Sequence, residues 1–188
     1  MQRPSIHFLW LVVGVFFASS CSQSDQPAPS MRDAILKAIE HTKTEDLFSN
    51  ESVEVSASKQ SDGSVKVLFS VPTSNFIADH GRFPTKPLME VRVTAKGAVS
   101  MHHDKSEKKT SKDQGPVAKS ESLAKAAAAV CADFSESDPS DPMEFAIDVS
   151  EDSEGFSVLY KCVPYMPGGF TLYKVSSEFK VLEAIPGL

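Results

Sequence analysis

The sequence predicts an α+β fold made of two tandem units, each with one helix packed on an antiparallel sheet. The first observation is an apolar helical stripe followed by alternating strands, a pattern that occurs twice along the chain. The second is an internal match, in which residues 31–72 align with residues 123–164 without a gap and seven of the 42 positions are identical. The third is a strongly polar segment, residues 102–119, which separates the two patterns as a predicted linker. Together these observations favour a duplicated unit.

The first unit, residues 31–101, is predicted to open with a helix. Ser30 is a suitable N-cap, and apolar residues recur at helical spacing after it. Gly63 marks the turn of the first hairpin, and residues 73–87 form a longer loop. Alternation of apolar and polar residues predicts four strands, over residues 53–57, 65–71, 91–95 and 98–101.

The second unit, residues 120–188, is predicted to repeat this order. Ser120 or Ser122 caps an alanine-rich helix that continues to Phe134. Strands are expected over residues 145–149, 156–163, 170–175 and 179–185. The apolar residues of strand 156–163 fall one position out of step with their gapless partners in the first unit. Either the hairpin turn differs by one residue or the alignment is wrong there, because a one-residue slip exchanges the two faces of a strand.

The N-terminal residues have the pattern of an export signal. Residues 1–20 contain one basic residue and then an apolar run, and they end with the small residues of Ala18-Ser19-Ser20-Cys21. This end resembles the lipobox of bacterial lipoproteins, with Ala18 where leucine is usual. The resemblance implies cleavage before Cys21 and a lipid on its sulfur. The alternative is ordinary cleavage nearby, with Cys21 an incidental thiol.

The residues after Cys21 imply where the protein is anchored. Ser22 follows the cysteine in place of the aspartate that marks inner-membrane retention in enterobacterial lipoproteins. By that resemblance the protein is lipid-anchored in the bacterial cell envelope, in the outer membrane, and faces the periplasm. Residues 21–30 are predicted to be a flexible tether between the lipid and the fold.

Three cysteines in an exported chain leave one thiol unpaired unless it is modified. Lipidation of Cys21 would leave Cys131 and Cys162 for one disulfide, which an oxidising periplasm favours. In the chain-entropy model, a loop of this length would stabilise the fold by about 3–4 kcal/mol. The alternative is two buried free thiols, which behave as small hydrophobic groups.

The charge balance restricts the classes of partner. The full chain has a formal net charge of −6, and loss of residues 1–20 removes one basic residue, which leaves −7. An acidic surface argues against a nucleic-acid partner. It is compatible with a cationic protein partner, such as a basic toxin or hydrolase. Contact with the membrane is expected through the lipid anchor only.

The predicted architecture has several resemblances. Two tandem helix-and-sheet units resemble the PepSY family of small bacterial envelope domains, and also the cystatin and nuclear-transport-factor-like folds. The segment from Gly168 to Val175, with a final strand after it, is similar to the closing hairpin of small bacterial immunity proteins of the nuclear-transport-factor-like type. A small acidic lipoprotein with tandem helix-and-sheet units, no evident catalytic set and an enlarged apolar loop is expected to be non-catalytic and to bind a protein partner, most concretely as an immunity or inhibitor protein that neutralises a toxic effector or an envelope hydrolase. The alternative is an outer-membrane assembly factor or a carrier of lipid or another ligand.

No catalytic motif is evident in the sequence. It contains no glycine-rich phosphate loop, no serine elbow and no metal motif of defined spacing, so we expect neither an enzyme nor a cofactor. The acid/base pair Asp79-His80 has no evident third group. The run His102-His103-Asp104 is read as solvated polar residues, and no metal site is predicted there.

Two segments are candidates for contact with a protein partner. The loop over residues 73–87 is longer than its counterpart in the second unit and combines aromatic residues with arginine, which are enriched at binding hot spots. Equally, this loop could fold back and cap the core of the first unit. The second candidate is the turn that begins at Tyr165. The predicted contact residues are Phe76, Ile77, Asp79, His80, Arg82, Phe83, Tyr165 and Met166.

Overall fold

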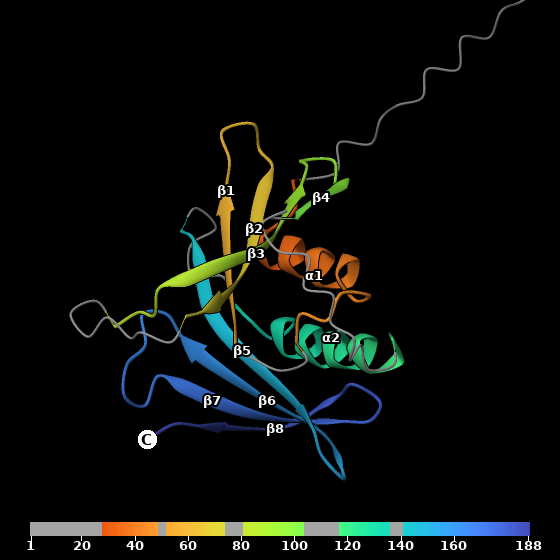
Figure 1. Cartoon of the computed structure of the whole chain (residues 1–188), viewed down its shortest axis with the longest axis vertical. Coiled ribbons are helices and arrows are strands. Elements are labelled where there is room, and N and C mark those ends of the chain that lie inside the picture. The colour runs from red at the N-terminus through yellow and green to blue at the C-terminus, as the bar shows by residue number, and fades with distance from the viewer. Residues whose placement is uncertain (1–27, 49–51, 74–80, 104–116, 136–140) are drawn as a thin grey trace, which may run out of the picture.

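The structure, a computed structural model, describes residues 28–48, 52–73, 81–103, 117–135 and 141–188. Two helices lie on the same face of one antiparallel sheet (Figure 1). The helices are α1 (Met31–His41) and α2 (Val117–Cys131). The strands are β1 (Val53–Lys59), β2 (Val65–Pro72), β3 (Thr85–Val93), β4 (Val99–His103), β5 (Met143–Glu151), β6 (Gly155–Cys162), β7 (Phe170–Ser176) and β8 (Val181–Pro186). Each predicted helix and strand is therefore present, although several bounds differ.

The two helices begin differently from one another. At α1, the hydroxyl oxygen of Ser30 accepts a hydrogen bond of 3.0 Å from the backbone N–H of Asp33, which confirms the predicted N-cap. Helix α2 begins at Val117, so the predicted cap at Ser120 or Ser122 is wrong. The hydroxyl of Ser120 instead donates a 2.6 Å hydrogen bond to Asp46, which fastens α2 to the segment after α1.

The eight strands form one sheet in the order β4-β3-β2-β1-β5-β6-β7-β8. The predicted fold class, two tandem helix-plus-sheet units of PepSY or cystatin type, is therefore wrong. The element order α-β-β-β-β does occur twice, but β1 pairs directly with β5, so the sheet continues from one half into the other. The physical reason is that β1 and β5 would otherwise be open edges with unpaired backbone groups, and pairing satisfies both.

The junction of β1 and β5 has the register of a two-fold axis. Glu54 lies opposite Ala146, and these two positions differ by 92, which is the offset of the sequence repeat. Val53 lies opposite Ile147 in the same ladder, while Val55 lies opposite Phe145. Each half therefore presents the same strand to the other, as in an isologous dimer interface. The predicted bounds of the repeats, 31–101 and 120–188, stay a prediction.

The one-residue mismatch between the halves arises in the hairpin turns. A hydrogen bond from the N–H of Gln60 to the carbonyl of Ser64 closes the three-residue loop 61–63, in which Gly63 has φ +77°. The equivalent bond, from Asp152 to Gly155, closes the two-residue loop 153–154. The strand after the turn is therefore offset by 91 instead of 92. The gapless alignment is wrong beyond the turn, and the apolar parity of β6 is explained.

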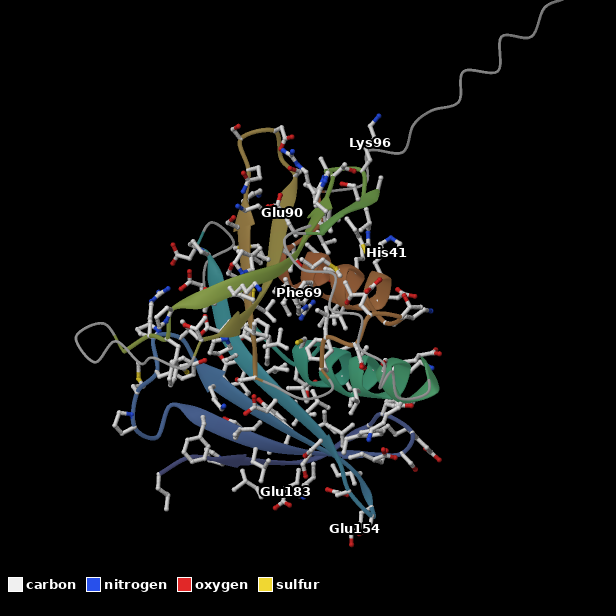
Figure 2. All side chains as sticks on the ribbon, viewed as in Figure 1. His41, Phe69, Glu90, Lys96, Glu154 and Glu183 are labelled. Carbon is white, nitrogen blue, oxygen red and sulfur yellow. The ribbon has the colours of Figure 1, made fainter. Side chains whose placement is uncertain are left out.

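The core lies between the sheet and the two helices. Figure 2 shows Phe69 of β2 in the interior, where its side chain is fully buried. Every other residue of each central strand joins it, in agreement with the predicted alternation. The buried set includes Val53, Val55, Ala57, Val65, Val67, Val91, Val93, Phe145, Ile147, Phe156 and Val158 from the sheet, with Ile35, Ile39, Leu123, Ala127 and Val130 from the helices.

The predicted disulfide is not formed. Both Cys131 on α2 and Cys162 at the end of β6 are free thiols. Cys131 is fully buried among apolar residues of the core, where a thiol packs as a small hydrophobic group. Cys162 lies beside Tyr160, and burial together with this thiol raises the pKa of Tyr160 to about 12. The alternative that the sequence left open, two free thiols, is the one observed.

The long loop predicted over residues 73–87 is shorter in the structure. Strand β3 already begins at Thr85, which lies opposite Pro72. Pro87 stands inside this strand, and the register of the β2–β3 ladder shifts between Phe69 and Ser70. Such an irregularity accommodates a residue without a backbone N–H.

Among the described residues, neither helix is long and apolar enough to cross a membrane.

Candidate binding surface on the open face of the sheet

The face of the sheet away from the helices, here called the open face, carries ionisable side chains at its centre. Alternation along β1 and β5 directs apolar residues to the helices and the residues between them to the open face. Glu54, Glu144, Asp148 and Lys161 all occupy such positions, and each is partly buried. Charged groups at the middle of a sheet need partners, because burial without them costs free energy.

Two segments that are distant in sequence meet on the open face. The backbone N–H of Tyr165 donates a hydrogen bond to the carbonyl of Gly81. The rings of Phe83 and Tyr165 form an edge-to-face pair with centroids 5.3 Å apart and planes at 81°. The turn at Tyr165 and the end of the loop before β3 are the two contact candidates from the sequence. The structure joins them into one surface.

Side-chain bonds attach this surface to the central strands. The hydroxyl of Tyr165 donates a 2.9 Å hydrogen bond to Oε1 of Glu54 on β1. Arg82 makes a 2.6 Å ion pair with Glu144 on β5, and both side chains keep partial access to solvent. These four residues, Glu54, Arg82, Glu144 and Tyr165, are called the polar centre below.

Burial dominates the electrostatics of the polar centre. The pKa of Glu54 is raised above its ordinary value, first by burial and further by the neighbouring carboxylate of Glu144. The hydrogen bond from Tyr165 and the charge of Arg82 oppose this rise. Burial and the hydrogen bond to Glu54 also raise the pKa of Tyr165. Tyr165 therefore stays a hydrogen-bond donor at neutral pH.

A second ion pair lies beside the polar centre, between Lys161 of β6 and Asp148 of β5, at 2.5 Å. The ammonium of Lys161 also donates a hydrogen bond of 3.4 Å to the hydroxyl of Ser52. Oδ1 of Asp148 is buried and has no hydrogen-bond partner in the structure. One carboxylate oxygen of Asp148 thus pairs with the ammonium of Lys161, while the other accepts no hydrogen bond in the structure.

The polar centre borders a small cavity of about 160 Å³. Its lining residues are Glu54, Val55, Ser56, Leu68, Ser70, Arg82, Thr85, Glu144, Phe145 and Val163. Pockets for small molecules typically have volumes of about 300–1,000 Å³, so this cavity is small for such a ligand. Its carboxylates, guanidinium and hydroxyls all converge on the open face.

A larger groove of about 420 Å³ lies elsewhere, between the start of α1 and the β3–β4 turn. Its ionisable residues are Asp33, Lys37 and Lys96, and Lys96 points outward at the edge of the molecule (Figure 2). We place the candidate site at the polar centre, where perturbed groups and convergent side chains coincide.

Four of the predicted contact residues are described, and the structure brings them together. Arg82 and Phe83 precede β3, while Tyr165 and Met166 follow β6; the side chain of Met166 is 57% exposed. Their binding role stays a prediction. The predicted contact residues Phe76, Ile77, Asp79 and His80 lie outside the described residues, as does the lipidation candidate Cys21.

Sequence reasoning missed the residues on the strands. The alternation of apolar and polar residues was used only to place the strands, so Glu54, Glu144, Asp148 and Lys161 were not among the candidate site residues. The signal that could have found them is the acidic residue between Val53 and Val55. Because a central strand has neighbours on both sides, a charge in its middle is expected to be partly buried and paired.

Metal-ligating residues do not converge in the part of the chain that the structure covers. No group of three or more histidine, cysteine, aspartate or glutamate side chains has a suitable arrangement among those residues. His102 lies on the edge strand β4 and is exposed, whereas Asp104, the last member of the His-His-Asp run, is not described.

Comparison with known proteins found no matching family model, and no match among curated proteins or solved structures.

Proposed function

We propose that this protein is a non-catalytic envelope lipoprotein that binds a protein partner through the open face of its sheet. Its most concrete form is an immunity or inhibitor protein that neutralises a toxic effector or an envelope hydrolase. The observation that carries the proposal is the junction of Phe83 with Tyr165, which joins two chain segments into one surface over the polar centre. The anchoring role assigned to Cys21 is part of the same proposal.

The composition of this surface supports a protein partner. Aromatic residues and arginine dominate binding hot spots, and here Phe83, Tyr165 and Arg82 are contiguous. Methionine adapts its shape to a partner, and Met166 stands exposed next to them. The bonds of Tyr165 to Gly81 and to Glu54 hold the surface in place before binding. A surface ordered in advance loses less entropy on association.

The charge of the chain supports a basic partner. A formal net charge of −6 over 188 residues accelerates association with a cationic protein and disfavours acidic ones. At the polar centre, two glutamates face one arginine. The partner is therefore expected to bring positive charge to the open face.

A second candidate function, assembly of outer-membrane proteins, has its own observation. Strand β8 is an edge of the sheet, and large apolar side chains beside it are exposed: Phe170 at 43%, Ile185 at 42% and Leu182 at 65%. An edge strand of this kind could pair with an extended segment of another chain. In that case the partners would be several, and they would bind at β8 instead of the polar centre.

A crosslinking capture from the native envelope tests both candidates, with the purified protein as bait. Recovery of one stoichiometric basic hydrolase or toxin supports the proposal, provided that Phe83→Ala weakens capture and Phe170→Ala does not. Phe170→Ala is the matched control because it removes an aromatic ring from a different part of the open face. Recovery of several different outer-membrane proteins, with capture weakened by Phe170→Ala and not by Phe83→Ala, would overturn the proposed function and support the assembly role.

A further inference from the structure

The cavity on the open face has the size of one side chain. Its volume is about 160 Å³, which is below the range of about 300–1,000 Å³ typical of pockets for small molecules. Most of the residues that line this space are polar or charged: Glu54, Ser56, Ser70, Arg82, Thr85 and Glu144. A group that enters it would replace waters at sites that already offer hydrogen bonds.

The internal two-fold axis indicates which group fits. Residues of β1 correspond to those of β5 at an offset of 92, and residues of β2 correspond to those of β6 at an offset of 91. The equivalent pairs around the cavity are Ser70 with Lys161, Ser56 with Asp148, and Glu144 with Ser52. The place equivalent to the cavity in the second half therefore contains the side chain of Lys161.

The two places offer the same chemistry to an ammonium group. In the second half, Lys161 pairs with the carboxylate of Asp148 and donates to the hydroxyl of Ser52. In the first half, the carboxylate and the serine hydroxyl exchange equivalent positions: Glu144 stands at the position of Ser52, and Ser56 stands at the position of Asp148. The serine at position 70 is too short to reach between them. The cavity occupies the space that a lysine side chain at position 70 would fill.

Among the described residues that line the cavity, two carboxylates stand against one guanidinium, which leaves one negative charge over. Arg82 balances Glu144 through their 2.6 Å ion pair. The hydrogen-bond partner of Glu54 is the neutral hydroxyl of Tyr165, which supplies no positive charge. A cation is therefore the complementary ligand.

We propose that the cavity receives one primary ammonium group, the side chain of a lysine that a basic protein partner inserts beside Glu54. This inference rests on the proposed function and specifies the chemical group that the partner supplies. The inserted ammonium takes the place that Lys161 holds in the other half. It donates to Glu54 and to the hydroxyls of the cavity, while Arg82 stays with Glu144.

Burial of the Glu54 carboxylate costs free energy in the free protein. Because a bound cation would offset this cost, the site is expected to bind a cation more tightly than its small volume suggests. Burial and the adjacent carboxylate raise the pKa of Glu54, so its charged form is disfavoured in the free protein. An ammonium in the cavity offsets both effects. Charge-assisted hydrogen bonds of this kind are shorter and stronger than neutral ones.

The test is a titration of the purified protein with N-acetyl-lysine methylamide, followed by the backbone amide shifts of Ser56, Ser70 and Thr85. The matched probe is N-acetyl-norleucine methylamide, which lacks only the ammonium. We expect saturable shifts with the lysine probe and none with the norleucine probe. Glu54→Gln should weaken binding about tenfold, the size of one hydrogen bond to a charged group.

Two further variants make the test specific. Ser70→Lys supplies an internal ammonium at the position equivalent to Lys161, and it should abolish the saturable shifts. Glu183→Gln removes a carboxylate from β8 at the edge of the sheet (Figure 2) and should leave binding unchanged. Equal shifts with both probes, or undiminished binding by Glu54→Gln or Ser70→Lys, would overturn the inference.

The titration needs no protein partner, so its result is separate from that of the capture experiment. Capture of a basic protein that is sensitive to Phe83→Ala but not to Glu54→Gln would overturn the lysine site and leave the proposed function in place. Saturable binding of the lysine probe without any captured partner would overturn the proposed function and leave the cavity as a cation site.

Discussion

The hydroxyl of Tyr165 lies 2.9 Å from Oε1 of Glu54, although the two residues are 111 positions apart in the chain. This hydrogen bond fastens the turn after β6 to the central strand β1. Because the N–H of Tyr165 also donates to the carbonyl of Gly81, the loop before β3 is held to the same turn. Three distant segments thus meet at one residue, and the consequences can be measured.

Tyr165→Phe should lower the free energy of unfolding by about 1–2 kcal/mol. The change leaves the ring and its contact with Phe83 in place, but removes the donor to a partly buried carboxylate. Urea unfolding measures the loss. The matched control is Tyr173→Phe, because among the described residues the hydroxyl of Tyr173 makes no hydrogen bond. Equal losses in the two variants would show that the bond to Glu54 contributes nothing.

The stability of the protein should depend on pH in two separate windows. Glu54 has a raised pKa, so the folded chain keeps its proton to a higher pH than the unfolded chain does. The free energy of unfolding should therefore fall as pH rises from 4.5 through the folded-state pKa of Glu54. Glu54→Gln should remove this decline from a series of urea midpoints between about pH 4 and 7.

The lower window belongs to a hairpin turn. A backbone hydrogen bond from Glu154, together with bonds from Ser157 and Lys174, holds the pKa of Asp152 at about 2. Because this pKa is depressed, the stabilising effect is present above pH 3.8 and is lost as pH falls towards 2. Asp152→Asn should flatten the pH dependence of the midpoint in that range, and it should lower the midpoint by a constant amount at every pH above it. An altered slope above that range, or an unchanged midpoint there, would contradict the assignment.

Cys131 should resist thiol reagents in the folded protein. Burial raises the pKa of its thiol, so the reactive thiolate is scarce. Cys162 is partly accessible and should react first. After denaturation without a reductant, both should react, and Cys131→Ala and Cys162→Ala identify the two contributions. Failure of either cysteine to react in the unreduced, denatured chain would contradict the free thiols seen here.

Local sequence patterns predicted the helices and strands well, because the burial pattern of a strand and the cap of a helix involve residues that are close together in the sequence. Alternation at Val53, Val55 and Ala57 reflects burial of one face, and Ser30 caps the helix that follows it. The start of β3 at Thr85 was missed, and the strand was expected only from residue 91, because Pro84 and Pro87 gave the preceding segment the composition of a loop. An extra residue of β3, Leu88, stands between the partners of Phe69 and Ser70, and this irregularity, which the sequence does not reveal, accommodates Pro87.

Long-range relationships could not be predicted in the same way. The pairing of β1 with β5 joins the edges of two half-sheets. The alternation of residues along Val53–Lys59 is the same whether or not a further strand pairs with β1, so it does not reveal this pairing. The contact of Gly81 with Tyr165 likewise depends on how two turns meet above the sheet. The cysteines gave a wrong pairing because the two that remain once Cys21 is set aside suggest a disulfide, without showing whether the geometry allows one.

Gly81→Ala should separate the loop from the turn. Gly81 has φ +58°, and a Cβ added there would lie 2.9 Å from the carbonyl oxygen of Tyr165 and 3.4 Å from Cβ of Pro164. The matched control is Gly63→Ala in the first hairpin, where φ is +77° but the nearest atom, Cβ of Ala95, is 3.6 Å away. Both changes carry the strain of a left-handed residue, about 1–2 kcal/mol, and Gly81→Ala adds a clash with backbone.

The two glycine variants therefore separate stability from binding. Both should lower the urea midpoint, and Gly81→Ala should lower it more. In the capture experiment, Gly81→Ala should also reduce recovery of the partner, because Arg82 and Phe83 shift with the displaced loop, whereas Gly63→Ala should not. Chemical shifts of the Tyr165 ring report the displacement directly. If both variants bind the partner equally well, the junction of loop and turn is a structural feature, and the partner binds elsewhere on the molecule.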